Sequence, residues 1–116
     1  PAVLERAGIA GAGSVALATP DLVSAARACK HARRLNPKIR VIARATARGE
    51  LGLLAEAGAN EVVQPEFEAG LEFVRRVLGW HGVGAEIAEH ETSVRRADYY
   101  HLDPDSTDRL SSSALR

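Results

Sequence analysis

The 116-residue sequence has little of what stabilises a secreted domain or anchors a chain in a membrane. Its single cysteine, Cys29, cannot form an internal disulfide, and no apolar run approaches the roughly 18 residues that a membrane-spanning helix needs. A secretory signal is lacking as well. We therefore expect a soluble chain in a reducing compartment, with no direct insertion into a membrane.

An excess of charge of either sign is also lacking. Fifteen Lys and Arg residues balance fifteen Asp and Glu residues, so no overall field draws the chain to nucleic acid or to an anionic surface. We expect no nucleic-acid partner. A chain of this length with 46% hydrophobic and 26% charged residues fits one modest globular domain. It begins with Pro1 rather than methionine, and we expect a piece of a longer protein.

Three short runs rich in Val, Ile or Ala predict buried strands at residues 14–18, 39–44 and 61–64. The runs lack strict alternation, which is typical of a parallel sheet. Between them, apolar residues recur at helical spacing over residues 21–35 and 48–57. Strands that alternate with helices predict an α/β fold, a parallel sheet with helices on its faces. Three strands leave two open edges, so we expect further strands from an upstream segment.

Residues 11–16 match the G-x-G-x-x-A pattern of a dinucleotide-binding turn. The glycines of such a turn must follow a strand and open a helix, because the free helix amides bind the pyrophosphate. Here a short helical turn over residues 3–7, closed by Gly8, comes before the match, and a strand follows it. We interpret the pattern as a helix-to-strand loop.

Two further helical patterns cover residues 67–78 and 85–100. The apolar stripe of the first helix can cover the sheet edge. The apolar residues that continue it, Trp80 and Ile87, have no obvious surface to pack against within so small a domain. An unpartnered apolar stripe favours a homodimer through this C-terminal helix. The alternative is a single long helix that folds back over its own sheet. Residues 102–116 have little apolar periodicity and predict a flexible tail.

The phrases "VLERAGI", "VALATPD", "LNPKIRVIARA" and "LAEAGANEVVQPEFEAG" follow one another in this order. Taken together and in this order, these four segments, over residues 1 to about 80, resemble the later half of a TrkA-N, or RCK, domain. This is the Rossmann-like regulatory module of potassium channels and cation:proton antiporters. The form "EVVQPEFEAG" is most similar to the cytosolic domains of Kef-type potassium efflux antiporters.

The resemblance implies a partial Rossmann-like sheet of about three strands with flanking helices and a C-terminal crossover helix. It divides the chain into the later half of a TrkA-N domain at residues 1–78, a crossover and dimerisation helix at 79–101 and the tail at 102–116. It implies a cytoplasmic location as the soluble part of an inner-membrane transport protein, a membrane transporter domain as partner, and NAD(H) or an adenine nucleotide as ligand of the intact domain. The family's Gly-rich turn and acidic ribose-binding residue have no counterpart here, so we expect no tight nucleotide binding by this chain alone.

Ligands of open parallel sheets lie beyond the carboxyl ends of the strands. This places four candidate nucleotide-binding residues in the loops after the predicted strands: Thr19, Asp21, Arg44 and Glu66. Thr19 and Asp21 could bind a ribose or an amide, but Asp21 could equally cap the helix that begins there. Arg44 could bind a phosphate or a carboxylate, or form a salt bridge to Glu66. Glu66 could contact a ligand or a partner subunit, or be an ordinary surface acid.

No catalytic or metal-binding constellation is predicted. The four histidines are separated by about ten residues or more, so no pair has the spacing of zinc ligands. Cys29 lies on the apolar side of its helix, which favours an inert, packed thiol. The principal hypothesis is a non-enzymatic regulatory fragment of a potassium or cation transport protein. The alternatives are half of an NAD(P)-dependent oxidoreductase and a stand-alone interaction module.

Overall fold

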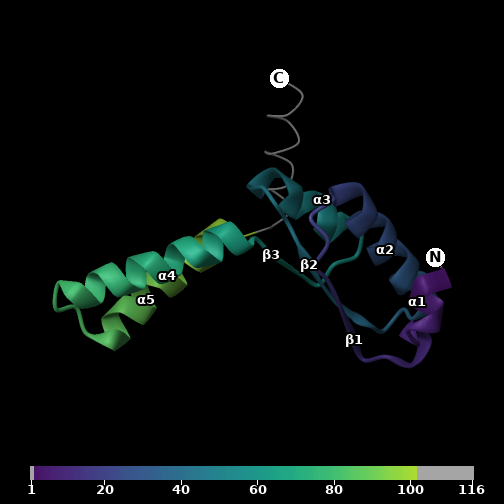
Figure 1. Cartoon of the computed structure of the whole chain (residues 1–116), viewed down its shortest axis with the longest axis horizontal. Coiled ribbons are helices and arrows are strands. Elements are labelled where there is room, and N and C mark those ends of the chain that lie inside the picture. The colour runs from purple at the N-terminus through teal and green to yellow at the C-terminus, as the bar shows by residue number, and fades with distance from the viewer. Residues whose placement is uncertain (1, 102–116) are drawn as a thin grey trace, which may run out of the picture. The chain divides into compact units, whose positions relative to one another are not determined.

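The computed structural model describes residues 2–101 (Figure 1). The chain forms two compact units, one ending at Gln64 and the other beginning at Pro65. The predicted tail lies outside the described residues. Among the helices of residues 2–101, none combines the length and the apolarity that crossing a membrane requires.

The first unit is built on a three-stranded parallel sheet in the order β1-β2-β3. The strands are β1 (Ser14–Leu17), β2 (Arg40–Arg44) and β3 (Glu61–Val63), within one residue of the predicted bounds. Both pairings are parallel. The predicted α/β class and its partial, Rossmann-like parallel sheet are therefore confirmed.

The helices of this unit also follow the sequence pattern. They are α1 (Ala2–Arg6), the 3-10 turn η1 (Ile9–Gly11), α2 (Leu22–Leu35), the 3-10 turn η2 (Arg48–Glu50) and α3 (Leu51–Glu56). The pattern over residues 48–57 predicted one helix, whereas the α-helix begins only at Leu51. Gly49 and Gly52 have low helix propensity, which explains why the first turn takes the tighter 3-10 form.

The core lies between the sheet and the pair α2 and α3. Val41 and Ala43 of β2 are buried on the same side as Cys29 of α2 and Leu54 of α3. Ile42 points to the other face and is 38% exposed. We expected helices on the faces of the sheet, but within this unit α2 and α3 both cover one face. Two successive crossovers of the same hand, between strands in the order 1-2-3, place their helices on the same side.

The G-x-G-x-x-A match lies in the connection from η1 into β1, so the interpretation as a helix-to-strand loop is confirmed. Gly8 follows α1 with φ 79°, the left-handed conformation that a glycine adopts without strain. Asn36, after α2, donates its Nδ2 to the carbonyl oxygens of Ile9 (3.1 Å) and Ala12 (2.8 Å). These bonds fasten the loop to the amino end of the sheet.

Arg33, in the last turn of α2, joins three segments at the same end of the sheet. Its guanidinium donates to the backbone oxygens of Pro37 and Ile39, before β2, and of Gly58, before β3. It also donates to Asn60 Oδ1 at 2.9 Å, and this oxygen accepts the backbone N–H of Val41 at 2.7 Å. One side chain thus fixes the entry into β2 and β3.

The second unit is a helical hairpin of α4 (Pro65–Trp80) and α5 (Ala85–Tyr99). Phe67 near the start of α4 stacks on Tyr99 at the end of α5, with ring centroids 3.7 Å apart. Glu68 accepts hydrogen bonds from Arg96 Nε (3.0 Å) and the Tyr100 hydroxyl (2.8 Å). The helices therefore run antiparallel. The alternative of a single long helix was wrong, because the chain reverses at residues 81–84, where Gly82 has φ 82°.

Candidate functional site

The carboxyl ends of β1, β2 and β3 lie at one edge of the sheet. We call the residues that follow them in the first unit the rim: Thr19 and Asp21 after β1, Arg44 at the end of β2 with Thr46 and Glu50 after it, and Gln64 after β3. Because parallel strands end at the same edge, their loops converge there. The rim is the position at which open α/β sheets bind ligands.

Asp21 is the N-cap of α2. Its Oδ2 accepts hydrogen bonds from the backbone N–H of Ser24 (3.2 Å) and from the Ser24 hydroxyl. The Ser24 hydroxyl and backbone bonds lower the pKa of the Asp21 carboxyl below its ordinary value, because both bonds stabilise the carboxylate. Thr19 Oγ1 in turn accepts the backbone N–H of Asp21 at 3.4 Å. The capping role that the sequence indicated is thus present, and the ligand role stays a prediction.

Arg44 is half-buried at the last position of β2. It lies on the same face of the sheet as Ile42, opposite the face that α2 and α3 cover, because side chains alternate along a strand. Glu66 belongs to the first turn of α4 in the second unit. The structure therefore places three of the four predicted site residues in the first unit, and a place for Glu66 beside them stays a prediction.

Sequence reasoning missed Glu50 as a member of the rim. Its Oε1 accepts the backbone N–H of Thr46 (2.9 Å) and its Oε2 accepts the Thr46 hydroxyl (2.8 Å). Gln64 Nε2 donates to the backbone oxygen of Thr46 at 3.3 Å. The sequence did contain a signal for this contact. Thr46 precedes Glu50 by four residues at the start of a helix, whereas the Thr and Glu of a capping box are three residues apart. These bonds hold the loop after β2 against the end of β3.

Comparison with known proteins identifies the family. Residues 1–65, more than half of the chain, match the TrkA-N domain. This chain belongs to the TrkA-N family. The match ends one residue after the boundary between the two units, so it covers the sheet unit and its rim.

Two relatives of the TrkA-N chain are similar in sequence. A putative K(+) efflux antiporter KefB of Alkalimonas amylolytica is 31% identical over 102 residues, 88% of this chain. An uncharacterised protein of Methanothermus fervidus is 41% identical over 68 residues, 59% of this chain. The chain spans 15% and 11% of the lengths of these relatives.

Two solved structures share the fold. The TrkA-N domain of the inner membrane protein ybaL from Escherichia coli is 32% identical with a TM-score of 0.58, over 62% of this chain and 53% of that one. The Kef CTD of Shewanella denitrificans, solved in an AMP-bound form, is 20% identical with a TM-score of 0.74, over 96% of this chain and 68% of that one. At 20% identity the second likeness supports the fold alone.

Two further reactive side chains of the first unit, Cys29 and His31, lie outside the rim. Cys29 is fully buried in the core, where burial raises the pKa of its thiol and disfavours the nucleophilic thiolate. His31 Nε2 is buried 3.9 Å from Oε1 of Glu5, a residue of α1. Within residues 2–101, no three His, Cys, Asp or Glu side chains are grouped closely enough to hold a metal ion.

Proposed function

We propose that this TrkA-N chain is part of a cytosolic regulatory domain of a potassium or cation transport protein, and that the domain senses a nucleotide. The observation that carries the proposal is the rim, where a parallel sheet presents Thr19, Asp21 and Arg44 from the ends of two adjacent strands. The family match and the similarity to a putative K(+) efflux antiporter support the transport context.

In this proposal each rim residue has a separate chemical task. Arg44 presents a planar fork of donors that fits a nucleotide phosphate. Thr19 and Asp21 contact ribose hydroxyls or a nicotinamide amide, and Glu66 of α4 is the fourth residue proposed to contact the ligand. The ligand is NAD(H) or an adenine nucleotide. The pyrophosphate-binding turn comes from residues outside this chain, because the G-x-G-x-x-A match here precedes a strand. This chain alone therefore binds nucleotides weakly.

The mechanism is a shift between two arrangements of the regulatory domain rather than a chemical reaction. A nucleotide that binds one arrangement more tightly increases its population by the difference in affinity. The attached transporter domain then shifts toward the transport state that accompanies the favoured arrangement of the regulatory domain. Since the chain spans 15% of the related antiporter, the transporter domain lies in the longer protein.

Arg44→Gln in the longer protein, with the segment that precedes Pro1 included, is expected to weaken AMP or NADH binding about tenfold or more. The reason is the loss of a charged hydrogen bond to phosphate. Isothermal titration calorimetry measures the affinities. The matched control is Arg40→Gln, which removes the same charge from the same face of β2 at the opposite end of the sheet. Equal affinities for the two variants would contradict the proposed role of Arg44.

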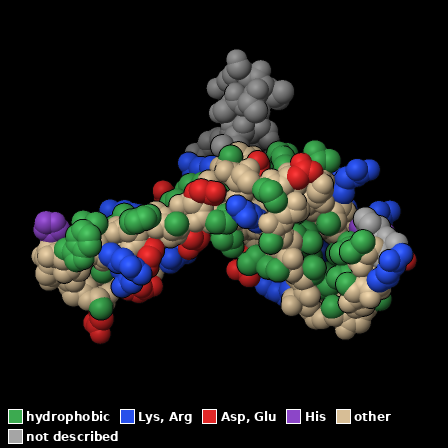
Figure 2. All heavy atoms as spheres, in the orientation of Figure 1, with side chains coloured by type: hydrophobic (Ala, Val, Ile, Leu, Met, Phe, Trp, Pro, Cys, Tyr) green, Lys and Arg blue, Asp and Glu red, His purple; other side chains and the backbone are tan. Residues whose placement is uncertain are grey.

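We also propose that the domain forms a homodimer through the C-terminal hairpin. Three large apolar side chains of α4, at positions i, i+4 and i+7, lie exposed on one side: Phe73 is 72% exposed, Val77 43% and Trp80 81%. Figure 2 shows hydrophobic side chains among the charged ones of the hairpin. An apolar stripe of this kind is stabilised by burial against a second copy.

Phe73→Ser is expected to shift the dimer toward monomer, raising the dissociation constant by about tenfold to a hundredfold, because the buried area of an aromatic anchor is lost. Light scattering over a dilution series measures the molecular mass. Val23→Ser, which removes an exposed apolar side chain from α2 in the first unit, is the control. A strictly monomeric parent chain at all concentrations would refute the dimer.

A further inference from the structure

The overall neutrality of the chain conceals an uneven distribution of charge. The first unit, up to Gln64, has nine Lys and Arg against five Asp and Glu. From Pro65 to His101 the balance is reversed, with four basic and seven acidic residues. A chain with no net charge can therefore have a basic surface on one of its units. That local surface, rather than the net charge of the whole chain, determines which charged molecules it attracts.

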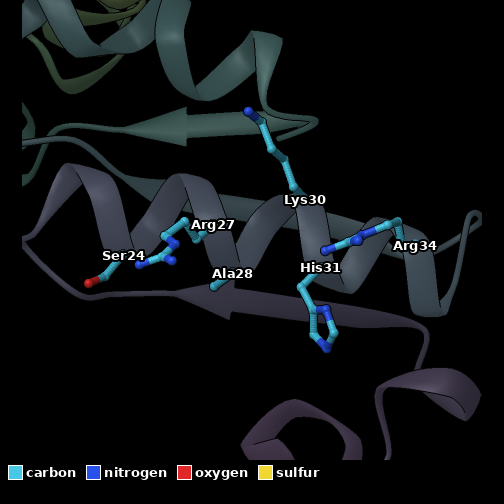
Figure 3. Close-up of a pocket in the computed structure, with 6 residues that line it drawn as sticks. All are labelled: Ser24, Arg27, Ala28, Lys30, His31 and Arg34. Carbon is cyan, nitrogen blue, oxygen red and sulfur yellow. The ribbon is translucent and has the colours of Figure 1, made fainter. Parts of the chain in front are cut away.

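Three of the nine Lys and Arg residues of the first unit, Arg27, Lys30 and Arg34, lie together on the outer side of α2. A shallow hollow there is lined by Ser24, Arg27, Ala28, Lys30, His31 and Arg34 (Figure 3). These side chains project from successive turns of the helix, with Lys30 and His31 directed to opposite sides of its exposed face. Three exposed cations, Arg27, Lys30 and Arg34, therefore share one face of a single helix, and His31 lies at its edge with its Nε2 buried.

These three cations have no anionic partner within the described residues. The side chains of Arg27, Lys30 and Arg34 form no hydrogen bond or ion pair there, and Glu5 Oε1 lies 3.9 Å from His31 Nε2. The hairpin is different. All four of its arginines are paired with glutamates, and these arginines are Arg75, Arg76, Arg95 and Arg96. The unpaired cations on α2 are therefore available to an anion from outside.

Exposed aliphatic side chains lie next to these cations. Val23 of α2 is 62% exposed and Leu53 of α3 is 53% exposed. They line a second shallow hollow, between α2 and α3, which shares Arg27 and Lys30 with the first and contains one carboxylate, Glu56. We call the combined exposed surface the basic face: Val23, Arg27, Lys30, Arg34 and Leu53.

We propose that the basic face binds the headgroups of anionic phospholipids at a membrane surface. Lys and Arg side chains attract the phosphates, while short aliphatic groups between them enter the boundary of the acyl region. The hollows are shallow and open, which fits a lipid surface better than an anchoring side chain of an acidic protein. Weak binding suffices if the transport protein of the proposed function holds the domain beside the bilayer, and to that extent the inference rests on it.

Flotation of the 116-residue chain with vesicles tests the inference. We expect the chain to float with vesicles of phosphatidylcholine and phosphatidylglycerol, not with phosphatidylcholine alone, and to be released at high ionic strength. The double variant Arg27→Gln/Lys30→Gln is expected to reduce partitioning at least about tenfold, since each cation contributes to the attraction. The double variant Arg75→Gln/Arg95→Gln removes the same charge from the hairpin and is expected to retain binding. Circular dichroism confirms that each variant is folded.

Equal flotation of the two double variants, or no flotation of the parent chain with anionic vesicles, would overturn the inference. Retention of the chain by immobilised polyglutamate without binding to vesicles would assign the basic face to an acidic polypeptide instead. Because this assay needs neither a nucleotide nor a transporter domain, its failure is distinguishable from failure of the proposed function, which the calorimetric comparison of Arg44→Gln and Arg40→Gln tests.

Discussion

Leu54→Ala is expected to destabilise the sheet unit by about 2–5 kcal/mol, which is the range for truncation of a buried leucine. Leu54 of α3 has no exposed surface and lies in the core between α3, α2 and the sheet. Its truncation removes apolar contacts and leaves a cavity that this close-packed layer can fill only in part. In a domain of this size, a loss of that order is a large fraction of the total stability.

Urea denaturation followed by far-UV circular dichroism measures the change in the free energy of unfolding. Fluorescence is the poorer probe, because the only tryptophan, Trp80, lies in the hairpin. The neighbouring variant Leu53→Ala provides a matched control, since the same atoms are removed from a side chain that is 53% exposed. We expect it to cost less than about 1 kcal/mol. Similar losses for the two variants would show that α3 is not packed as described.

Arg33→Met is expected to destabilise the same unit by about 2 kcal/mol or more. The methionine keeps the apolar stem but removes a guanidinium whose partners are three backbone carbonyls and the Asn60 side chain. Hydrogen bonds from a charged donor are stronger than neutral ones, and part-buried carbonyls that lose their donor carry a desolvation cost. The loops before β2 and β3 would then lose their common attachment to α2.

The next residue along the chain is the control for this second variant. The side chain of Arg34 is exposed and has no hydrogen bond or ion pair within residues 2–101, so Arg34→Met is expected to change stability by less than about 0.5 kcal/mol. Arg33→Lys is expected to recover only part of the loss, because one ammonium group cannot reach acceptors on both sides of the guanidinium fork. The same denaturation experiment compares all three. Equal stability of the Met variants at 33 and 34 would show that the hydrogen bonds of Arg33 contribute nothing net.

The amino and carboxyl ends of the sheet differ in the hydrogen bonds that their side chains form. At the amino end, Arg33, Asn36 and Asn60 tie loops to helix and strand through side-chain bonds to the backbone. At the carboxyl end, the bonds of Asp21 to Ser24 and of Glu50 to Thr46 are local, and Gln64 joins the loop after β2 to the end of β3. A rigid amino end fixes the strands, and this positions the loops in which the proposed nucleotide-binding residues lie.

Much of this architecture follows from the sequence by short-range rules. The spacing of apolar residues in α2, its Asp21 start and its Asn36 end predict the helix almost to the residue. The order of helix, glycines and strand likewise excluded a nucleotide-binding turn at residues 11–16, because that chemistry requires the opposite order. Interactions between near neighbours decide both features, so the local sequence contains the information.

Tertiary structure alone decided the features that depend on distant residues. The bonds of Arg33 to Gly58 and Asn60, and the bond of Gln64 to the backbone oxygen of Thr46, join residues far apart in the sequence. The joint covering of one sheet face by α2 and α3 depends on crossover geometry. The pairing of every hairpin arginine with a glutamate, and the lack of such partners for the side chains of Arg27, Lys30 and Arg34 within the described residues, are likewise seen only in the folded chain. The sequence by itself determined the elements and their order, whereas the folded chain determined which side chains face one another and which face the solvent, because these are properties of three-dimensional packing.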